Sequence, residues 1–260
     1  MRDQSSRHLR RALPVVLLVL GAVTAVLLFH RRAPHAESQV TSLAVLPFTI
    51  EAAEPGAGFL AAGLSADLRY RLQSVEDLQC IPHLEVLART LGGQDWRQLA
   101  QQLGAEILIS GKLRESSGKV QIAIEILDTR VGTLIRSSTL EESRDRILDL
   151  HRRLAREVIA DLPVALTREQ QARIDQQATR SLKAWEAFAQ GTGHLDDLVN
   201  PRAPIFAAEL LHRAVELDPD FFLARSHLSA ALWLEFMSVG NPDRLREAEL
   251  QARRALEDRP

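Results

Sequence analysis

The stretch SLAVLPFTI, residues 42–50, is nearly all apolar and rich in residues that favour β-structure. Such a run predicts a strand buried on both faces, because a strand with one solvated face alternates apolar and polar residues. Helices normally cover a sheet of this kind on both sides. The stretch therefore predicts an α/β fold that begins near Ser42.

Helices and further strands follow this first strand. Residues 59–75 predict an amphipathic helix that packs on the sheet, because leucines recur at every fourth position from Leu60 to Leu72. A short strand is predicted at 78–82 and a short helix at 85–90. A second helix begins near Trp96 and stops at Gly104.

An antiparallel meander is predicted next, because residues 105–114, 120–127 and 133–140 alternate apolar and polar side chains between turn-forming segments. Apolar positions from Ile147 to Leu162 then predict a closing helix, which Pro163 ends. The α/β domain is thus expected to span residues 42–162.

Five motifs in this region resemble, in order, those of the TolB-amino-terminal-like (FlgO-like) domain. They are AVLPF (44–48), FLAAGL (59–64), QLAQQLGAE (98–106), ISGKL (109–113) and ILDTRVG (126–132). The resemblance implies a mixed sheet with helices. It also implies a place beyond a membrane helix and before tetratricopeptide repeats, as in the membrane-distal part of CadC/ToxR-type regulators and related membrane signalling proteins. In that family the cytoplasmic end carries a winged-helix DNA-binding domain, a kinase or a cyclase.

The amino terminus predicts a membrane anchor. Residues 12–29 (ALPVVLLVLGAVTAVLLF) carry no charge and are long enough, as a helix, to cross a hydrocarbon core of about 30 Å. Four arginines lie in the tail at 1–11 and two follow the span, which favours a cytoplasmic amino terminus. A linker at 30–41 would then lead to a periplasmic main part. A cleaved signal peptide and a twin-arginine export signal are the alternatives.

The carboxyl-terminal half predicts helical repeats. After a connecting helix at 163–180, residues 181–260 contain AVELDP (214–219) and ALEDRP (255–260), which lie 41 residues apart. The positions that resemble a tetratricopeptide pattern are Ala207, Leu211, Ala214, Pro219, Leu228, Ser229, Leu232, Ala248, Ala252, Ala255 and Pro260. The usual period is about 34 residues, and we expect the excess in the turn around 238–243. About two hairpins, an incomplete array, are predicted.

Partner binding is expected on these repeats. Trp185, Phe188, Trp233 and Phe236 recur at helical spacing, so they either line a groove for a protein or peptide or form the repeat core. We expect these hairpins to lack a capping helix, which makes their end a candidate surface for oligomerisation as well.

The sequence predicts no catalytic, cofactor or metal site. With 32 basic and 34 acidic residues there is no net field to gather nucleic acid, and the single Cys80 excludes an internal disulfide. The eight histidines lack metal-ligand spacing and are expected at the surface. The Gly-x-Gly-x-x-Ala of residues 56–61 is separated from the preceding strand by acidic residues, which disfavours a phosphate site.

These observations predict an α/β domain followed by all-α tetratricopeptide-type hairpins, anchored by one transmembrane helix in the bacterial cytoplasmic membrane. The expected function is that of a scaffold or sensor without enzymatic activity. One alternative is the membrane-distal half of a transcriptional regulator or kinase signalling protein that lacks its effector domain. The other is a nucleotide-binding enzyme that uses the loop from Gly56 to Ala61.

Overall fold

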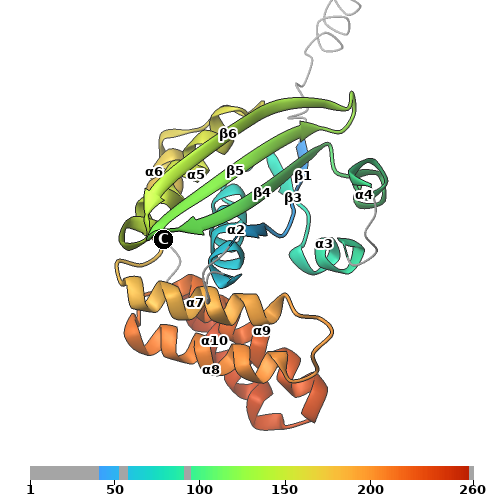
Figure 1. Ribbon diagram of the computed structural model, residues 1–260. Coiled ribbons are helices and arrows are strands. Elements are labelled where there is room, and N and C mark those ends of the chain that lie inside the picture. The colour runs from blue at the N-terminus through green and yellow to red at the C-terminus, as the bar shows by residue number, and fades with distance from the viewer. Residues whose placement is uncertain (1–40, 53–57, 91–94, 258–260) are drawn as a thin grey trace, which may run out of the picture. The chain divides into compact units, whose positions relative to one another are not determined.

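The computed structural model describes residues 41–52, 58–90 and 95–257 (Figure 1). In these ranges a mixed α/β sheet domain is followed by helical hairpins, as the sequence predicts. Within the same ranges no helix combines the length and the apolar character that a membrane crossing requires. The predicted cytoplasmic tail and transmembrane span lie outside the described residues.

The sheet combines parallel and antiparallel strands. They are β1 (Thr41–Val45), β2 (Thr49–Ala52), β3 (Leu78–Cys80), β4 (Ile107–Ser116), β5 (Lys119–Asp128) and β6 (Thr133–Ser143). The main order is β3-β1-β4-β5-β6, and β2 also pairs with β4. The pairs of β1 with β3 and of β1 and β2 with β4 are parallel. β4, β5 and β6 form the predicted antiparallel meander.

The single strand predicted over 42–50 is wrong: β1 and β2 lie one after the other along β4. Leu46 still donates its N–H to the carbonyl of Ile109 at 2.8 Å, but Pro47 has no N–H to continue the ladder. The ring of Phe48 then covers Gly111 of β4. A Cβ at position 111 would lie 2.6 Å from the Phe48 ring, so this contact requires glycine.

Helices cover both faces of the parallel part of the sheet. α2 (Gly58–Leu72) and α5 (Ile147–Ala160) form the main core with residues such as Leu43 and Ile107. α3 (His83–Thr90) and α4 (Trp96–Leu103) form a smaller core on the other face with Ala44 and Leu108. A short 3-10 turn, η1 (Arg144–Arg146), joins β6 to α5.

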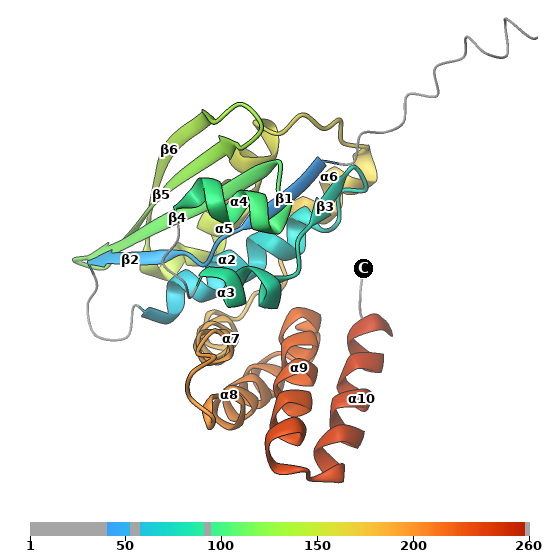
Figure 2. The ribbon, with the colours of Figure 1, turned by 90° about the vertical axis from the view of Figure 1, so that its right-hand side faces the viewer.

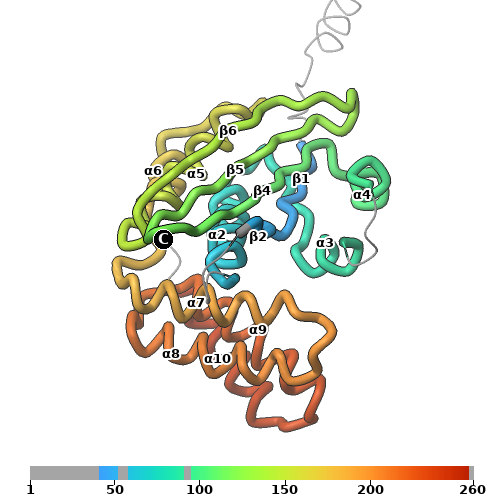
Figure 3. Tube along the Cα trace, in the orientation of Figure 1, coloured from blue at the N-terminus to red at the C-terminus, as the bar shows by residue number. Residues whose placement is uncertain are grey.

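The helical region consists of α6 (Arg168–Asp175), α7 (Leu182–Leu195), α8 (Ala203–Leu217), α9 (Phe222–Val239) and α10 (Pro242–Glu257). Figure 2 shows α7 to α10 side by side below the sheet domain, and the trace in Figure 3 follows the chain through them. α7 and α8 approach closely at Gly191, where a Cβ would lie 2.6 Å from Cγ of Leu211.

The connecting helix predicted over 163–180 is shorter than expected. α6 begins after Thr167, whose hydroxyl accepts from the N–H of Gln170 while the Gln170 side chain accepts from the N–H of Thr167. It ends at Asp175, because Gln176 already has an extended backbone.

The position predicted for the additional repeat residues is also wrong. The turn between α9 and α10 contains only Gly240 and Asn241, and Gly240 ends α9 in the left-handed conformation with φ of 74°. The additional residues instead lengthen α9, which has 18 residues and includes Ser238. Apolar side chains continue through Met237 and Val239, so the helical pattern persists where a turn was expected.

α2 is shared by the two regions. It packs on the sheet and on α5, and α7 covers its opposite side. All its residues except Gly58, Phe59 and Tyr70 are buried, including Asp67, Arg69 and Arg71. The leucine stripe therefore identifies only one of the two covered faces of this helix.

Candidate functional site

The repeat-defining positions mostly form the core between helices. Ala207, Leu211, Ala214, Leu228 and Leu232 are fully buried, and Ala248 and Ala255 nearly so. Ser229 donates to the carbonyl of Ala248 at 2.8 Å and thereby ties α9 to α10. Ala252 is half-buried and Pro219 is exposed, while Pro260 lies outside the described residues.

The four aromatic residues considered for a partner groove do not form one surface. Trp185 and Phe188 are 2% and 0% exposed and belong to the core, so they do not line an accessible groove. Phe188 packs against Phe221 with ring centroids 5.1 Å apart. Phe236 is half-buried, and Trp233 is the one member that is well exposed, at 46%.

A groove lies instead where the carboxyl end of α2 meets α9 and α10. This junction groove has a volume of about 310 Å³ and is lined by Tyr70, Gln73, Phe222, Leu223, Ser226, Ser229, Ala252, Ala255 and Leu256. The rings of Tyr70 and Phe222 are 4.9 Å apart and join the sheet domain to α9. The lining is apolar apart from three small polar groups and the Tyr70 hydroxyl, as is typical of a surface that accepts apolar side chains.

The exposure of Leu256 distinguishes this groove from the interior of the hairpins. Val215 lies 41 residues earlier, at the equivalent position of α8, and packs partly buried against the main core. Leu256 is 71% exposed at the edge of the groove. Tyr70 and Phe222 have no local signal in the sequence, whereas a comparison of positions 41 residues apart singles out Leu256 against Val215.

A buried charge cluster lies between α2, α5 and α6. Arg71 donates to both carboxylate oxygens of Asp67, at 2.6 and 3.2 Å, and to the carbonyls of Ile174 and Gln176. Nδ1 of His151 lies 3.4 Å from Asp67. Burial alone would raise the pKa of Asp67, but Arg71 and His151 outweigh it and hold the pKa well below its ordinary value.

The ring of His151 also packs edge-on against Trp185 of α7, with centroids 4.7 Å apart. His151 is buried, so the prediction that the histidines are surface residues is wrong at this position. The carboxylate and guanidinium satisfy each other, and the cluster joins four helices. Its geometry indicates a structural role rather than a chemical one.

A second polar cluster joins α3 to the helical region. Nε2 of His83 lies 2.6 Å from the carboxylate of Asp196, which follows α7. Burial lowers the pKa of His227 to about 4 and raises that of the Cys80 thiol to about 12. At neutral pH His227 is therefore a neutral imidazole and Cys80 a protonated thiol, which is a poor nucleophile. Nowhere in the described ranges do three or more histidine, cysteine or acidic residues come together as metal ligands would.

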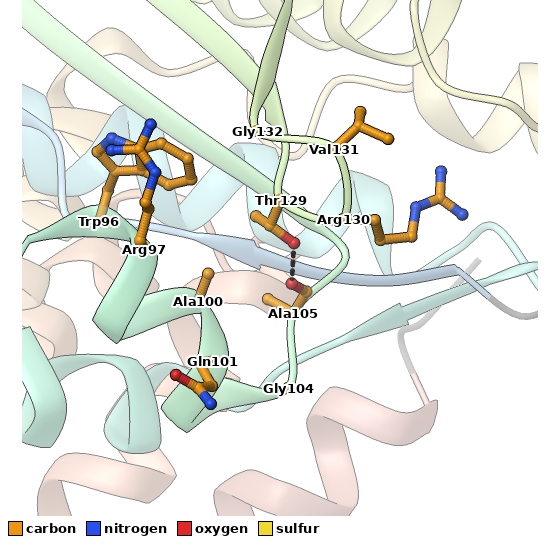
Figure 4. Close-up of a pocket in the computed structure, with 10 residues that line it drawn as sticks. All are labelled: Trp96, Arg97, Ala100, Gln101, Gly104, Ala105, Thr129, Arg130, Val131 and Gly132. Carbon is orange, nitrogen blue, oxygen red and sulfur yellow. Dashed lines mark hydrogen bonds between the residues drawn. The ribbon is translucent and has the colours of Figure 1, made fainter.

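Another cleft lies between α4 and the turn that joins β5 to β6 (Figure 4). It has a volume of about 500 Å³, with Trp96 and Arg97 on one side and Arg130 on the other. Arg97 stacks over Trp96 at 4.3 Å. Arg130 is paired with Asp128 at 2.8 Å and with Glu106 at 3.8 Å. The acidic partners therefore offset the charge of Arg130.

The glycine motif considered for nucleotide binding can be placed only in part. Gly56 and Ala57 of the glycine motif lie outside the described residues, while Leu60 and Ala61 are buried in α2. Ser116 and Lys119 face each other across the hairpin of β4 and β5. The Lys119 ammonium donates to Glu141 at 2.7 Å. That pair serves the turn, in which Ser117 and Gly118 both have positive φ.

Comparison with known proteins finds one curated relative and several distant structural neighbours. No protein-family model matches the chain. The "Putative adenylate cyclase 3" of Rhizobium meliloti (strain 1021) is 24% identical over 219 residues, which are 83% of this chain and 37% of that protein. The chain thus spans little more than a third of the length of this relative.

The solved structures show only a distant similarity to the sheet domain. TolB from Acinetobacter baumannii has a TM-score of 0.36 and 11% identity, with 48% of this chain and 29% of that chain covered. The LpoB carboxyl-terminal domain from Salmonella enterica has a TM-score of 0.32 and 11% identity, over 42% and 87%. PelC from Paraburkholderia phytofirmans has a TM-score of 0.35 and 15% identity, over 51% and 94%.

Proposed function

We propose that this chain is a membrane-anchored sensor or scaffold module without enzymatic activity, which binds a protein or peptide partner through tetratricopeptide-like hairpins. The junction groove supports this proposal. It is apolar, lies between the hairpins and the sheet domain, and exposes Leu256 where the equivalent Val215 is packed. An accessible apolar surface of this kind is a common feature of partner sites.

The groove is also placed so that binding reaches the sheet domain directly. Tyr70 belongs to α2, which packs on the sheet, and its ring contacts Phe222 of α9. A partner in the groove would touch both regions at once. Binding would then alter the sheet domain directly through α2, because no flexible linker separates the groove from this helix.

Site-specific photo-crosslinking in living cells tests this proposal. A benzophenone amino acid at position 256 is expected to capture one discrete partner, while the same probe at the exposed Arg246 of α10 captures none. The Leu256→Asp variant, with its probe at Ser226 in the same groove, should lose that adduct. Equal adducts from positions 256 and 246 would contradict the proposal.

The membrane position is part of the proposal and rests on residues 12–29 and the flanking arginines. Protease added to spheroplasts should degrade the chain while a cytoplasmic control survives. An antibody to residues 181–257 would report the loss of the band. A protected band would show that the folded part faces the cytoplasm.

A second candidate function is favoured by the curated relative. Because the chain matches 37% of a putative adenylate cyclase, it fits the sensory portion of a larger signalling protein whose output domain lies elsewhere. A related alternative is a transcriptional regulator or a kinase signalling protein with the same membrane-distal half. The neighbouring reading frames discriminate these possibilities, since a cyclase, a winged-helix or a kinase domain would be encoded in or beside the gene.

A further inference from the structure

The two hairpins can be compared position by position, because their sequence pattern repeats after 41 residues. Ala184, Ala187 and Gly191 of α7 are buried, and so are their equivalents Arg225, Leu228 and Leu232 of α9. Gly191 contacts Leu211 of α8, and Arg225 donates to Gln251 of α10, so this face meets the second helix in both hairpins. The spacing therefore holds for the first helices of the hairpins as well as for the second.

One face of these helices differs between the two copies. Trp185, Ala189 and Thr192 of α7 are at most 2% exposed. Their equivalents in α9, Ser226, Ala230 and Trp233, are exposed, and Met237 extends the same face by one turn with 62% exposure. We call Ser226, Ala230, Trp233 and Met237 the α9 stripe. It contains no charged residue.

The occupant of this face on α7 is a helix, namely α2. A Cβ at Gly63 of α2 would lie 2.7 Å from Cβ of Ala189 and 3.0 Å from the Trp185 ring. Phe59, one turn earlier in α2, contacts Gly193, one turn later in α7. The two helices therefore run antiparallel and in close contact along the positions that are exposed in α9.

From this correspondence we propose that the α9 stripe binds an amphipathic helix of a partner protein, in the manner in which α7 binds α2. The inference rests on the proposed function and specifies its partner. The stripe is continuous with the α2–α7 interface, because Tyr70 near the end of α2 contacts Phe222 at the start of α9 and Ser226 lines the junction groove. From Ser226 to Met237 it is about 16 Å long, so the partner segment needs about three helical turns.

The side chains of the stripe also define a specificity. Trp233 stands where α7 has the small Thr192, and Ser226 stands where α7 has the large Trp185. The large side chain therefore lies toward the carboxyl end of the face on α9, whereas on α7 it lies toward the amino end. A partner helix that runs antiparallel to α9 should place a small residue against Trp233 and, about seven residues later, a large apolar residue against Ser226. α2 itself, with Gly63 near the Trp185 end, has the opposite arrangement.

The test uses a phage library of random 16-residue peptides, selected on the full chain in lipid nanodiscs. Selected peptides are synthesised with fluorescein, and their affinities are measured by anisotropy. We expect apolar residues at helical spacing, at least tenfold weaker binding to the Trp233→Asp and Met237→Asp variants, and at least a tenfold loss when proline replaces a central residue of the peptide. Leu250→Asp is the matched control, because Leu250 is as exposed as Trp233 but lies on α10.

The variants separate this inference from the proposed function. Binding that tolerates both Trp233→Asp and a central proline, but is lost in Leu256→Asp, would overturn the helix inference and leave the junction groove as a peptide site. Binding that none of the three variants weakens, or a library without binders, would overturn both. Thermal melting followed by circular dichroism checks that each variant is folded.

Discussion

Gly63 of α2 lies so close to Ala189 of α7 that a Cβ on the glycine would be 2.7 Å from Cβ of the alanine. The reciprocal contact one turn away places Gly193 of α7 against the ring of Phe59. Two glycines, one on each helix, thus allow the backbones of α2 and α7 to approach. This contact joins the sheet domain to the first hairpin.

Gly63→Ala should therefore destabilise the protein. The added methyl group cannot be accommodated without moving α7, at a cost of about 1–3 kcal/mol that exceeds the gain in helix propensity of about 1 kcal/mol. Urea unfolding measures the change. Gly58→Ala is the control, because its Cβ would meet only Cδ1 of Ile50 at 3.6 Å. A Gly63→Ala variant as stable as the control would contradict the close packing.

The Asp67–Arg71 pair should be essential for folding. Arg71→Met removes the guanidinium and leaves a carboxylate buried without its main partner, which typically costs about 3–5 kcal/mol. The control is Arg253→Met, because Arg253 pairs with Glu249 at 2.6 Å on an exposed face where such pairs contribute less than about 1 kcal/mol. The double variant Asp67→Leu with Arg71→Met should recover part of the loss, and failure to do so would indicate that Arg71 acts mainly through the carbonyls of Ile174 and Gln176.

Stability should fall on mild acidification because of His227. Its pKa is about 4 in the folded chain, owing to burial and despite the hydrogen bond to Leu223, against an ordinary value of 6.5. Between these two values only the unfolded chain binds the proton, so the free energy of unfolding decreases as pH falls from 6.5 to 4, by at most about 1.4 kcal/mol per pH unit.

His227→Asn removes this dependence while its amide can still donate to the carbonyl of Leu223. The unfolding free energies of the two proteins, measured by urea titration at pH 7, 6, 5 and 4.5, should converge as the pH falls. Curves that stay parallel would show that His227 does not titrate in this range. Arg69, His83 and Asp196 are the charged or titratable groups that face it, and they are unchanged in the comparison.

Alanine substitution of two tryptophans should change the stability of the protein to very different extents. Trp185→Ala empties a buried site between α2, α5 and α7 and should cost about 3–5 kcal/mol. Trp233→Ala should change stability by less than about 0.5 kcal/mol, because the side chain is 46% exposed. Urea unfolding of both variants measures the change in the free energy of unfolding. A large loss of stability in Trp233→Ala would mean that the α9 stripe is already covered within the chain.

Local patterns in the sequence predict most of the elements, and the failures have specific causes. Alternation in β4 to β6 and the leucine spacing of α2 report directly on local periodicity. Pro47 divides the first strand because one missing donor outweighs the apolar character of residues 42–50. The continuation of α9 through Ser238 is not evident from the sequence, because a glycine and a proline nearby favour a longer turn.

The site was less predictable, because it depends on contacts between distant segments. Trp185 and Trp233 look alike in sequence, and only the packing of α2 on α7 makes one core and the other surface. Asp67 and Arg71 also lie off the leucine stripe, and they are buried because α5 and α6 cover that side of α2. The periodicity of a helix does not indicate which other helix covers its second buried face.

The position of α2 also determines how this chain can be divided. A cut in residues 163–180, between the sheet domain and the hairpins, would uncover the side of α2 that contains Gly63 and separate Arg71 from part of its hydrogen-bonding partners. Chimaeras that exchange the hairpins at this boundary would need to carry a matching α2 with them. The sheet domain together with its first hairpin is therefore the smallest part of this chain that can be exchanged or expressed as one packed unit.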